Sequence, residues 1–377
     1  MLRTLISSFL ALFLARPTEA TPTVPASGKR WTLKSRPTGV VSADNFALER
    51  VTMAADELAA DEVLIQVELL SIDAFLRTML DETAFHGSVS LGSVLPAVGM
   101  GTVVASNSKK FKVGSRVMGM LGAQSYARLS ATKSPPEIFP AMKLPGVPLR
   151  AMLGALSLTT GITAYVGLFS VAKPPRKGQT VVITAAAGAV GSIAAQLAKR
   201  TGAKVIGVAG GKEKCTFLEE ALALDGAVDY KSDDESVGAQ LDRLAPEGID
   251  FLFDNTGGPV LDAVLDRLKS NKKARVVVCG GASQYSGNLN HGKVVGPSSY
   301  LKLAERSATM HGFAVFHFMH KLPAALAYLW WLTLRKKLVM HEQVEQGLEA
   351  FGDAMTKMWS GGHVGKLFVN VSATGLV

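Results

Sequence analysis

The chain has 377 residues, of which 48% are hydrophobic and 19% are charged, so it can bury a folded core, and its length favours two domains. Its formal net charge is +9. The Lys and Arg residues are scattered, and the longest block is Arg335-Lys336-Lys337, a pattern that argues against nucleic-acid binding. Cys215 and Cys279 are the only cysteines, which excludes a disulfide-built fold and a four-cysteine zinc site.

Residues 1–20 differ from the rest of the chain. They combine Arg3, an apolar run from Leu5 to Leu14 and small residues up to Ala20, a pattern that predicts a cleaved secretory signal. Arg16 and the lack of acids before Glu19 keep an organellar transit peptide open. Residues 21–30, rich in Pro, Ala and Thr, are expected to form a linker. The mature chain is expected to have no membrane span, because the apolar run is too short to cross a bilayer.

Residues 31–150 predict a compact, mostly β domain. Short Val- and Gly-rich runs with strand character are Glu62–Leu70, Leu95–Ala105 and Gly114–Met120.

Residues 151–339 show a different rhythm, in which short β-rich runs alternate with helical spacing. The predicted strands are Thr180–Ala185, Lys204–Ala209, Val228–Tyr230, Ile249–Asp254 and Ala274–Cys279. The predicted helices are Ala189–Thr201, Lys212–Leu224, Ser236–Leu244 and Pro259–Ser270. This alternation indicates an α/β, doubly wound parallel sheet. The apolar segment Ala324–Leu334 is too short to span a membrane and is expected to be a buried helix. After about residue 338 the character is mixed, ending in a predicted strand at Lys366–Val371.

The turn after the first of these strands is typical of a dinucleotide site. A strand leads through small residues into a helix, whose N-terminal N–H groups and dipole attract a pyrophosphate. The residues at the turn are Ala187, Gly188, Ala189, Val190 and Gly191. Alanine stands where the fingerprint has its first glycine, so an ordinary strand-to-helix turn remains an alternative.

The end of the second strand favours NADP(H) over NAD(H). An NAD-selective site usually places an acid there, which would repel a 2′-phosphate. Here the strand ends in Gly210-Gly211-Lys212-Glu213-Lys214. A lysine at a helix N-terminus is unfavourable unless an anion offsets it, although Lys212 and Lys214 could also simply be solvated.

Several segments in fixed order resemble the zinc-independent medium-chain dehydrogenase/reductase superfamily. More narrowly, they resemble its prostaglandin reductase and NADP-dependent alkenal double-bond reductase family. The segments are WTLKSRPTG from Trp31, DAFLR at Asp73–Arg77, GITAY at Gly161–Tyr165, AAAGAVGS at Ala185–Ser192, FDNTGG at Phe253–Gly258, CGGASQY at Cys279–Tyr285 and VGKLFV at Val364–Val369. The resemblance implies a Rossmann-type domain at 151–339 and a GroES-like domain at 31–150, completed by about 340–377.

The resemblance also implies roles for single residues. Lys204, Gly210, Gly211 and Tyr230 would surround the adenosine phosphate. Further contacts to the cofactor are expected from Asn255, from the strand carrying Phe313 and Val315, and from His363, which stands where the family has asparagine. The implied substrate is a small-molecule enone or enal. A homodimer is left open.

Tyr285 is the catalytic candidate, because it matches the family's substrate-facing tyrosine. Reduction of an enone C=C bond builds negative charge on the carbonyl oxygen, which a positioned hydroxyl can stabilise. A packing role for this tyrosine remains an alternative. No catalytic metal is expected, since neither cysteine lies in the β domain and His311, His317 and His320 are more simply surface histidines. A quinone reductase, and a non-enzymatic NADPH-binding sensor or structural protein, are the competing interpretations.

Overall fold

The computed structural model describes residues 27–53, 58–134, 136–286 and 293–372. The predicted N-terminal signal lies outside the described residues. The chain divides into two units: the first holds residues up to Leu153, Gln343–Gly362 and those from Leu367, and the second holds Gly154–Glu342 and His363–Lys366. The expected linker at 21–30 is wrong from Ser27 onward, because strand β1 (Ser27–Leu33) begins there and pairs with β2 (Phe46–Thr52).

The first unit is built around a seven-stranded sheet in the order β14-β15-β3-β4-β5-β7, with β6 also paired to β3. The strands are β3 (Glu62–Ile72), β4 (Val98–Ser106), β5 (Arg116–Met120), β6 (Tyr126–Ser130), β7 (Ile138–Pro140), β14 (Glu342–Gln346) and β15 (Lys366–Asn370). Strand β3 is buried almost throughout, as expected for the apolar run that predicted it. This is the GroES-like part of the fold.

Among the described residues, the first unit also has two α-helices, α2 (Phe75–Thr78) and α10 (Phe351–Ser360). The short α2 carries the DAFLR segment, and Arg77 within it is fully buried. Its guanidinium donates to the carboxylate of Asp81 at 2.8 Å and to the backbone carbonyl of Gly39 at 2.9 Å. This segment therefore has a structural explanation, since a buried guanidinium needs such partners.

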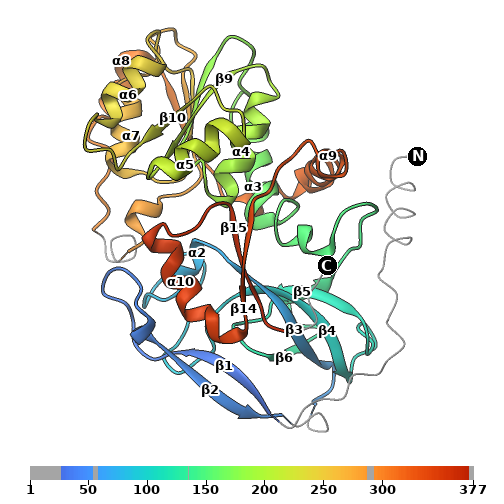
Figure 1. The fold of residues 1–377 in the computed structure, drawn as a ribbon. Coiled ribbons are helices and arrows are strands. Elements are labelled where there is room, and N and C mark those ends of the chain that lie inside the picture. The colour runs from blue at the N-terminus through green and yellow to red at the C-terminus, as the bar shows by residue number, and fades with distance from the viewer. Residues whose placement is uncertain (1–26, 54–57, 135, 287–292, 373–377) are drawn as a thin grey trace. The chain divides into compact units, whose positions relative to one another are not determined.

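The second unit contains a six-stranded parallel sheet in the order β10-β9-β8-β11-β12-β13; Figure 1 labels β9 and β10 of this sheet. The strands are β8 (Thr180–Ile183), β9 (Lys204–Ala209), β10 (Gly226–Asp229), β11 (Phe251–Asp254), β12 (Arg275–Val278) and β13 (Thr309–Gly312). Numbered within the sheet this is the 3-2-1-4-5-6 order of dinucleotide-binding folds, and the order reverses between β8 and β11. The doubly wound sheet predicted from the sequence is confirmed.

Helices cover both faces of this sheet. They are α3 (Thr163–Val166), α4 (Ala189–Lys199), α5 (Lys212–Thr216), α6 (Val237–Leu244), α7 (Gly258–Leu265), α8 (Leu301–Arg306) and α9 (Leu322–Leu334). In Figure 1, α6, α7 and α8 lie on one side of the sheet and α3 and α4 on the other. The core under α6 and α7 joins side chains such as Leu241 and Val264 to Val182 and Val208 of the strands.

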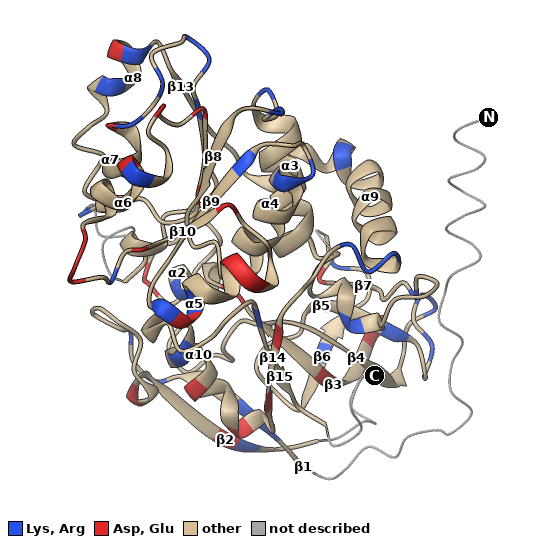
Figure 2. Cartoon of the chain, turned by 45° about the horizontal axis from the view of Figure 1, so that its top comes forward, with Lys and Arg blue, Asp and Glu red and all other residues tan. Residues whose placement is uncertain are grey.

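Helix α9 corrects a prediction, because only one of its faces is buried. Ala325, Leu329 and Leu332 are fully enclosed, whereas Trp331 is 40% exposed and Leu334 is 39% exposed. Figure 2 shows the helix without charged residues along its length. Apolar periodicity alone could not separate a helix enclosed on all sides from one packed on a single side. Among the described residues, no helix is long and apolar enough to cross a membrane.

Candidate functional site

The turn after β8 leaves the start of helix α4 open to an anion. The N–H of Gly188 donates to the carbonyl of Ala185 at 2.9 Å, and the N–H of Ser192 donates back to Gly188 at 2.9 Å. The N–H groups of the residues in between, Ala189 to Gly191, have no carbonyl of an earlier helical turn to donate to. No side chain caps this helix. The arrangement provides N–H donors and the positive end of a helix dipole at one point.

Two features of the turn explain its small residues. A Cβ on Gly191 would lie 2.2 Å from the carbonyl oxygen of Ala185, so only glycine lets helix and turn approach this closely. Ala185 itself has a φ of 47°, in the left-handed region that non-glycine residues seldom adopt. The alanine that opens the turn therefore holds this conformation at some cost.

A polar network joins β8 and β11 at the point where the strand order reverses. The hydroxyl of Thr184 donates to the buried carboxylate of Asp254 at 2.8 Å and accepts from the N–H of Asn255 at 2.7 Å. The side-chain amide of Asn255 donates to the carbonyl of Thr184 at 2.6 Å. Burial raises the pKa of Asp254, while its hydrogen bonds act in the opposite direction. The network fixes Asn255 at the crevice where such sheets bind dinucleotides.

The carboxyl ends of β9 and β10 meet beside this turn. A Cβ on Gly210 would come within 2.6 Å of the Tyr230 ring, so the glycine allows the ring to lie against the backbone. The carboxylate of Asp229 accepts from the N–H of Gly211 at 2.7 Å and from that of Lys231 at 2.9 Å. The Asp229 carboxylate therefore links the loop after β9 to the loop after β10.

Lys204 is not brought to this site. It is the first residue of β9 and lines a pocket with Lys177, Gly202 and Asp225 at the amino edge of the sheet. Gly210 follows the last residue of the same strand. At about 3.3 Å per residue, a six-residue strand separates its ends by roughly 17 Å. The prediction that Lys204 stands beside Gly210 and Gly211 is therefore wrong.

Lys214 is the lysine that lies at the correct edge. It is the third residue of α5, three positions after Gly211, and is half-buried. Burial lowers its pKa, and the nearby charge of Lys231 lowers it further. Glu213 raises this pKa by less than burial and Lys231 lower it, so the charges of Lys214 and Lys231 at this edge fit a site for a dianionic phosphate. The lysines after Gly211 indicated a phosphate site in the sequence, but the sequence did not show that Lys214, and not Lys204, lies at it.

The remaining predicted cofactor residues are placed as follows. Phe313 and Val315 do not belong to a strand, because β13 ends at Gly312 and a 3-10 helix begins at Val315. The parallel pairing of β12 and β13 puts Phe313 at the carboxyl edge of the sheet. His363 is next to the α4 turn, since Gly365 donates to the carbonyl of Ala187 at 2.7 Å and forms a bridge with Gly188.

Tyr285 closes the same edge, in a loop that follows β12. Its hydroxyl accepts from the N–H of Gly281 at 3.2 Å, and the residue is partly buried. Burial raises the pKa of this phenol, and the neighbouring Cys279 and Asp254 act in the same direction. The group is therefore protonated at neutral pH and can donate a hydrogen bond.

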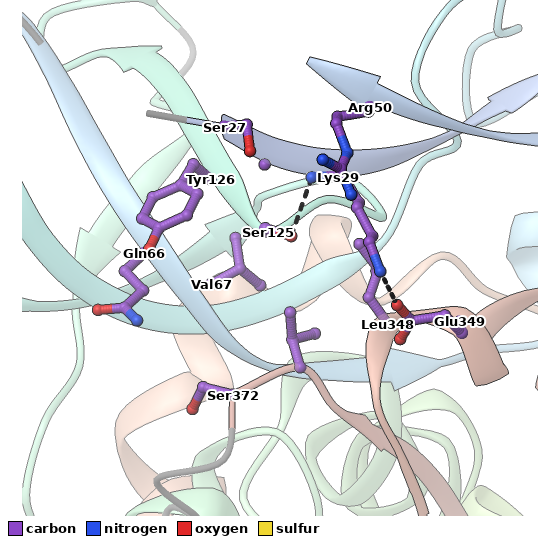
Figure 3. A pocket seen from close by; sticks show the side chains of 12 residues that line it. Ser27, Lys29, Arg50, Gln66, Val67, Ser125, Tyr126, Leu348, Glu349 and Ser372 are labelled. Atoms are coloured by element: carbon purple, nitrogen blue, oxygen red, sulfur yellow. Dashed lines mark hydrogen bonds and ion pairs between the residues drawn. The ribbon is translucent and has the colours of Figure 1, made fainter. Parts of the chain in front are cut away.

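Neither a metal site nor the cavity of the first unit belongs to this site in the described residues. Within the described part of the chain, no group of three His, Cys, Asp or Glu side chains could hold a metal ion. The first unit has a cavity of about 460 Å³ in which Lys29 pairs with Glu349 (Figure 3). None of the residues predicted for cofactor or substrate lines it.

Comparison with known proteins supports one relationship over nearly the whole chain. Residues 29–136 match the family described as the N-terminal domain of oxidoreductase, and residues 189–331 match the family described as zinc-binding dehydrogenase. The tobacco (Nicotiana tabacum) 2-alkenal reductase (NADP(+)-dependent) is 34% identical over 349 residues, which cover 92% of this chain and 98% of that protein. The Escherichia coli NADPH-dependent curcumin reductase is 32% identical, covering 91% and 97%.

Solved structures agree with this relationship. CurA from Vibrio vulnificus, in complex with NADPH, superposes with a TM-score of 0.81 at 33% identity, covering 91% of this chain and 99% of that one. The turn, the strand order and these relatives lead to the same assignment. The chain belongs to the zinc-independent medium-chain dehydrogenase/reductase superfamily, within the family of NADP-dependent alkenal and curcumin reductases.

Proposed function

We propose that this enzyme reduces the C=C bond of α,β-unsaturated ketones and aldehydes, with hydride added to the β-carbon. By its family it is an NADPH-dependent reductase. The observation that carries the proposal is the placement of the Tyr285 hydroxyl at the carboxyl edge of the sheet, on the same edge as Asn255 and the α4 turn. The names of the tobacco and Escherichia coli relatives support this substrate class.

The residues present fit NADPH. The uncapped start of α4 would hold the pyrophosphate. Because Gly191 has no Cβ, that helix can pack closely against the turn. Lys214 and Lys231 would hold the 2′-phosphate, which relieves the repulsion that lowers the Lys214 pKa. Bound NADPH supplies the hydride; positioning and the stabilisation of charge are left to the protein.

The task of the protein is to stabilise the charge that develops on the carbonyl oxygen of the substrate. Because Tyr285 accepts a hydrogen bond from the Gly281 N–H, its hydroxyl is polarised and becomes a stronger donor. The same hydrogen bond lowers the pKa of the phenol, but burial outweighs it, and the group is protonated at neutral pH as an ordinary tyrosine is. An oxyanion donor of this kind typically contributes about 2.7–4 kcal/mol to the transition state.

Turnover of an enone, an enal and a quinone, measured side by side with NADPH, tests the proposal. The enone or enal should have the highest kcat/KM, and a quinone as the clearly preferred substrate would contradict it. The Tyr285→Phe variant removes the donor and keeps the ring, so kcat for the enone should fall by about 10²–10³. The Kd for NADPH should hardly change. Unchanged kcat and kcat/KM would show that Tyr285 only packs.

A further inference from the structure

The second unit has a pocket of about 450 Å³ at the amino edge of its sheet, the edge opposite the cofactor turn. It is formed where β12 and β13 begin, at Arg275 and Thr309, and by the loop that leads into β8. Cofactor and substrate chemistry is assigned to the carboxyl edge, so this pocket has no role in it.

Every charged residue that lines this pocket is a lysine or an arginine. It contains six cations and no acid: Lys173, Arg176, Lys177, Lys272, Lys273 and Arg275. The five other than Arg275 are exposed, and none of them forms an ion pair with a carboxylate of the described residues. Like charges gathered in one concave site repel each other and raise the local concentration of anions.

Arg275 lies at the base of the pocket and is the unusual member of the group. Only 8% of this residue is exposed, and its Nε has no hydrogen-bond partner. One terminal nitrogen donates to Oε1 of Gln179 at 3.1 Å, and the guanidinium lies over the ring of Phe251 at 5.4 Å. A largely buried guanidinium that has no carboxylate partner among the described residues is costly, so its position calls for an explanation.

The neighbouring carboxylate of Asp250 does not provide that explanation. Asp250 lies close enough to favour the charged form of Arg275. Its carboxylate is already bound by the Thr180 N–H at 2.9 Å, by Lys269 at 2.9 Å and by Asn271 at 3.2 Å. Arg275 forms no ion pair within the part of the chain that the structure describes, and burial lowers its pKa.

We propose that this pocket, with Arg275 at its base and lysines around its rim, is a second anion site that binds a small ligand bearing two or more phosphate groups. A guanidinium fork matches phosphate oxygens, and the lysines add point charges. The volume admits a small molecule, and the lining contains no aromatic side chain on which a nucleic-acid base would stack. The same phosphate chemistry is offered by a free polyphosphate compound and by a phosphorylated lipid headgroup.

The test is a calorimetric titration of the full chain, saturated with NADP⁺ so that the cofactor site is filled. Inorganic tripolyphosphate is the probe, at about 0.15 M salt. One equivalent should bind. The triple variant Lys173→Gln/Lys272→Gln/Lys273→Gln should bind at least tenfold more weakly, with its reductase activity retained.

A matched control removes the same charge elsewhere. Lys34, Lys109 and Lys112 are exposed lysines of the first unit, and the variant with all three changed to Gln should bind within twofold of the wild type. Equal losses in the two triple variants would show general charge attraction and overturn the proposal. Arg275→Lys, checked for an unchanged Tm, keeps the charge but loses the fork, and should also bind more weakly.

Binding to phosphatidylcholine vesicles that contain phosphatidylinositol bisphosphate distinguishes a lipid headgroup from a free phosphate compound as the ligand. Vesicle binding that tripolyphosphate displaces supports a lipid headgroup in this pocket. Binding of tripolyphosphate without vesicle binding supports a free ligand. If neither probe binds the wild-type protein, the proposal is wrong.

Discussion

Replacement of Lys214 by alanine should weaken the binding of NADPH much more than that of NADH. Lys214 stands at the start of α5, beside Gly211 and within the field of Lys231. A hydrogen bond to a charged group contributes about 1.5–3 kcal/mol. Lys214 is half-buried and Lys231 would share the phosphate, so the lower end applies, which corresponds to about a tenfold rise in the Kd and KM for NADPH. The KM for NADH, which lacks the 2′-phosphate, should change by less than twofold.

Lys204→Ala is the matched control, because it makes the same change in the same strand-and-helix unit at the opposite edge of the sheet. Its KM for NADPH should stay within twofold of the wild type. Steady-state kinetics of both variants with both cofactors provide the measurement. Equal rises for Lys204→Ala and Lys214→Ala would refute the placement of the phosphate. So would a Lys214→Ala effect of the same size on NADH and NADPH.

The pH dependence gives an independent readout of the same lysine. Burial and Lys231 lower the pKa of Lys214, so it loses its proton at a lower pH than an ordinary lysine, whose pKa is about 10.4. Only the protonated form attracts a phosphate. The kcat/KM for NADPH in the wild type should therefore begin to fall below that pH, and this fall should be absent in Lys214→Ala.

Three further predictions concern other parts of the chain. Gly191→Ala should lower the free energy of unfolding, measured by denaturant titration, by about 1–3 kcal/mol and should weaken NADPH binding, because the new Cβ would lie 2.2 Å from the Ala185 oxygen. Gly188→Ala would place its Cβ 3.2 Å from that oxygen and should lower the free energy of unfolding by less. Burial, with Asp229 and Glu219, raises the pKa of Cys215 to about 11, and burial with Asp254 raises that of Cys279 to about 12. Both thiols should therefore resist iodoacetamide at pH 8 in the native protein, and rapid alkylation seen by mass spectrometry would contradict this. The mature N-terminus in the native source should lie between Thr21 and Ser27, because later cleavage would remove residues of β1; Edman sequencing that finds an intact Met1 would count against a cleaved signal.

Much of the second unit could be predicted from local sequence pattern. Alternating strand and helix periodicity identified the parallel sheet, and the five predicted strands differ from the observed ones only at their ends, whereas the sixth, β13, was not among them. The small residues from Ala185 to Gly191 identified the turn, because the close approach of helix and strand restricts side-chain size locally. Tyr285 came from a resemblance, and no periodicity in its Gly/Ser-rich loop would have singled it out.

The tertiary structure decided what depends on which distant segments meet. It placed Lys204 and Lys214 at opposite edges, since an extended strand separates its two ends whatever their distance in sequence suggests. It buried the face of α9 that carries Ala325, Leu329 and Leu332, and left Trp331 on the other face partly exposed. It also gathered the cations of residues 173–177 and 272–275 around one pocket. Those segments lie about a hundred residues apart, and only the pairing of parallel strands brings their amino ends to the same edge.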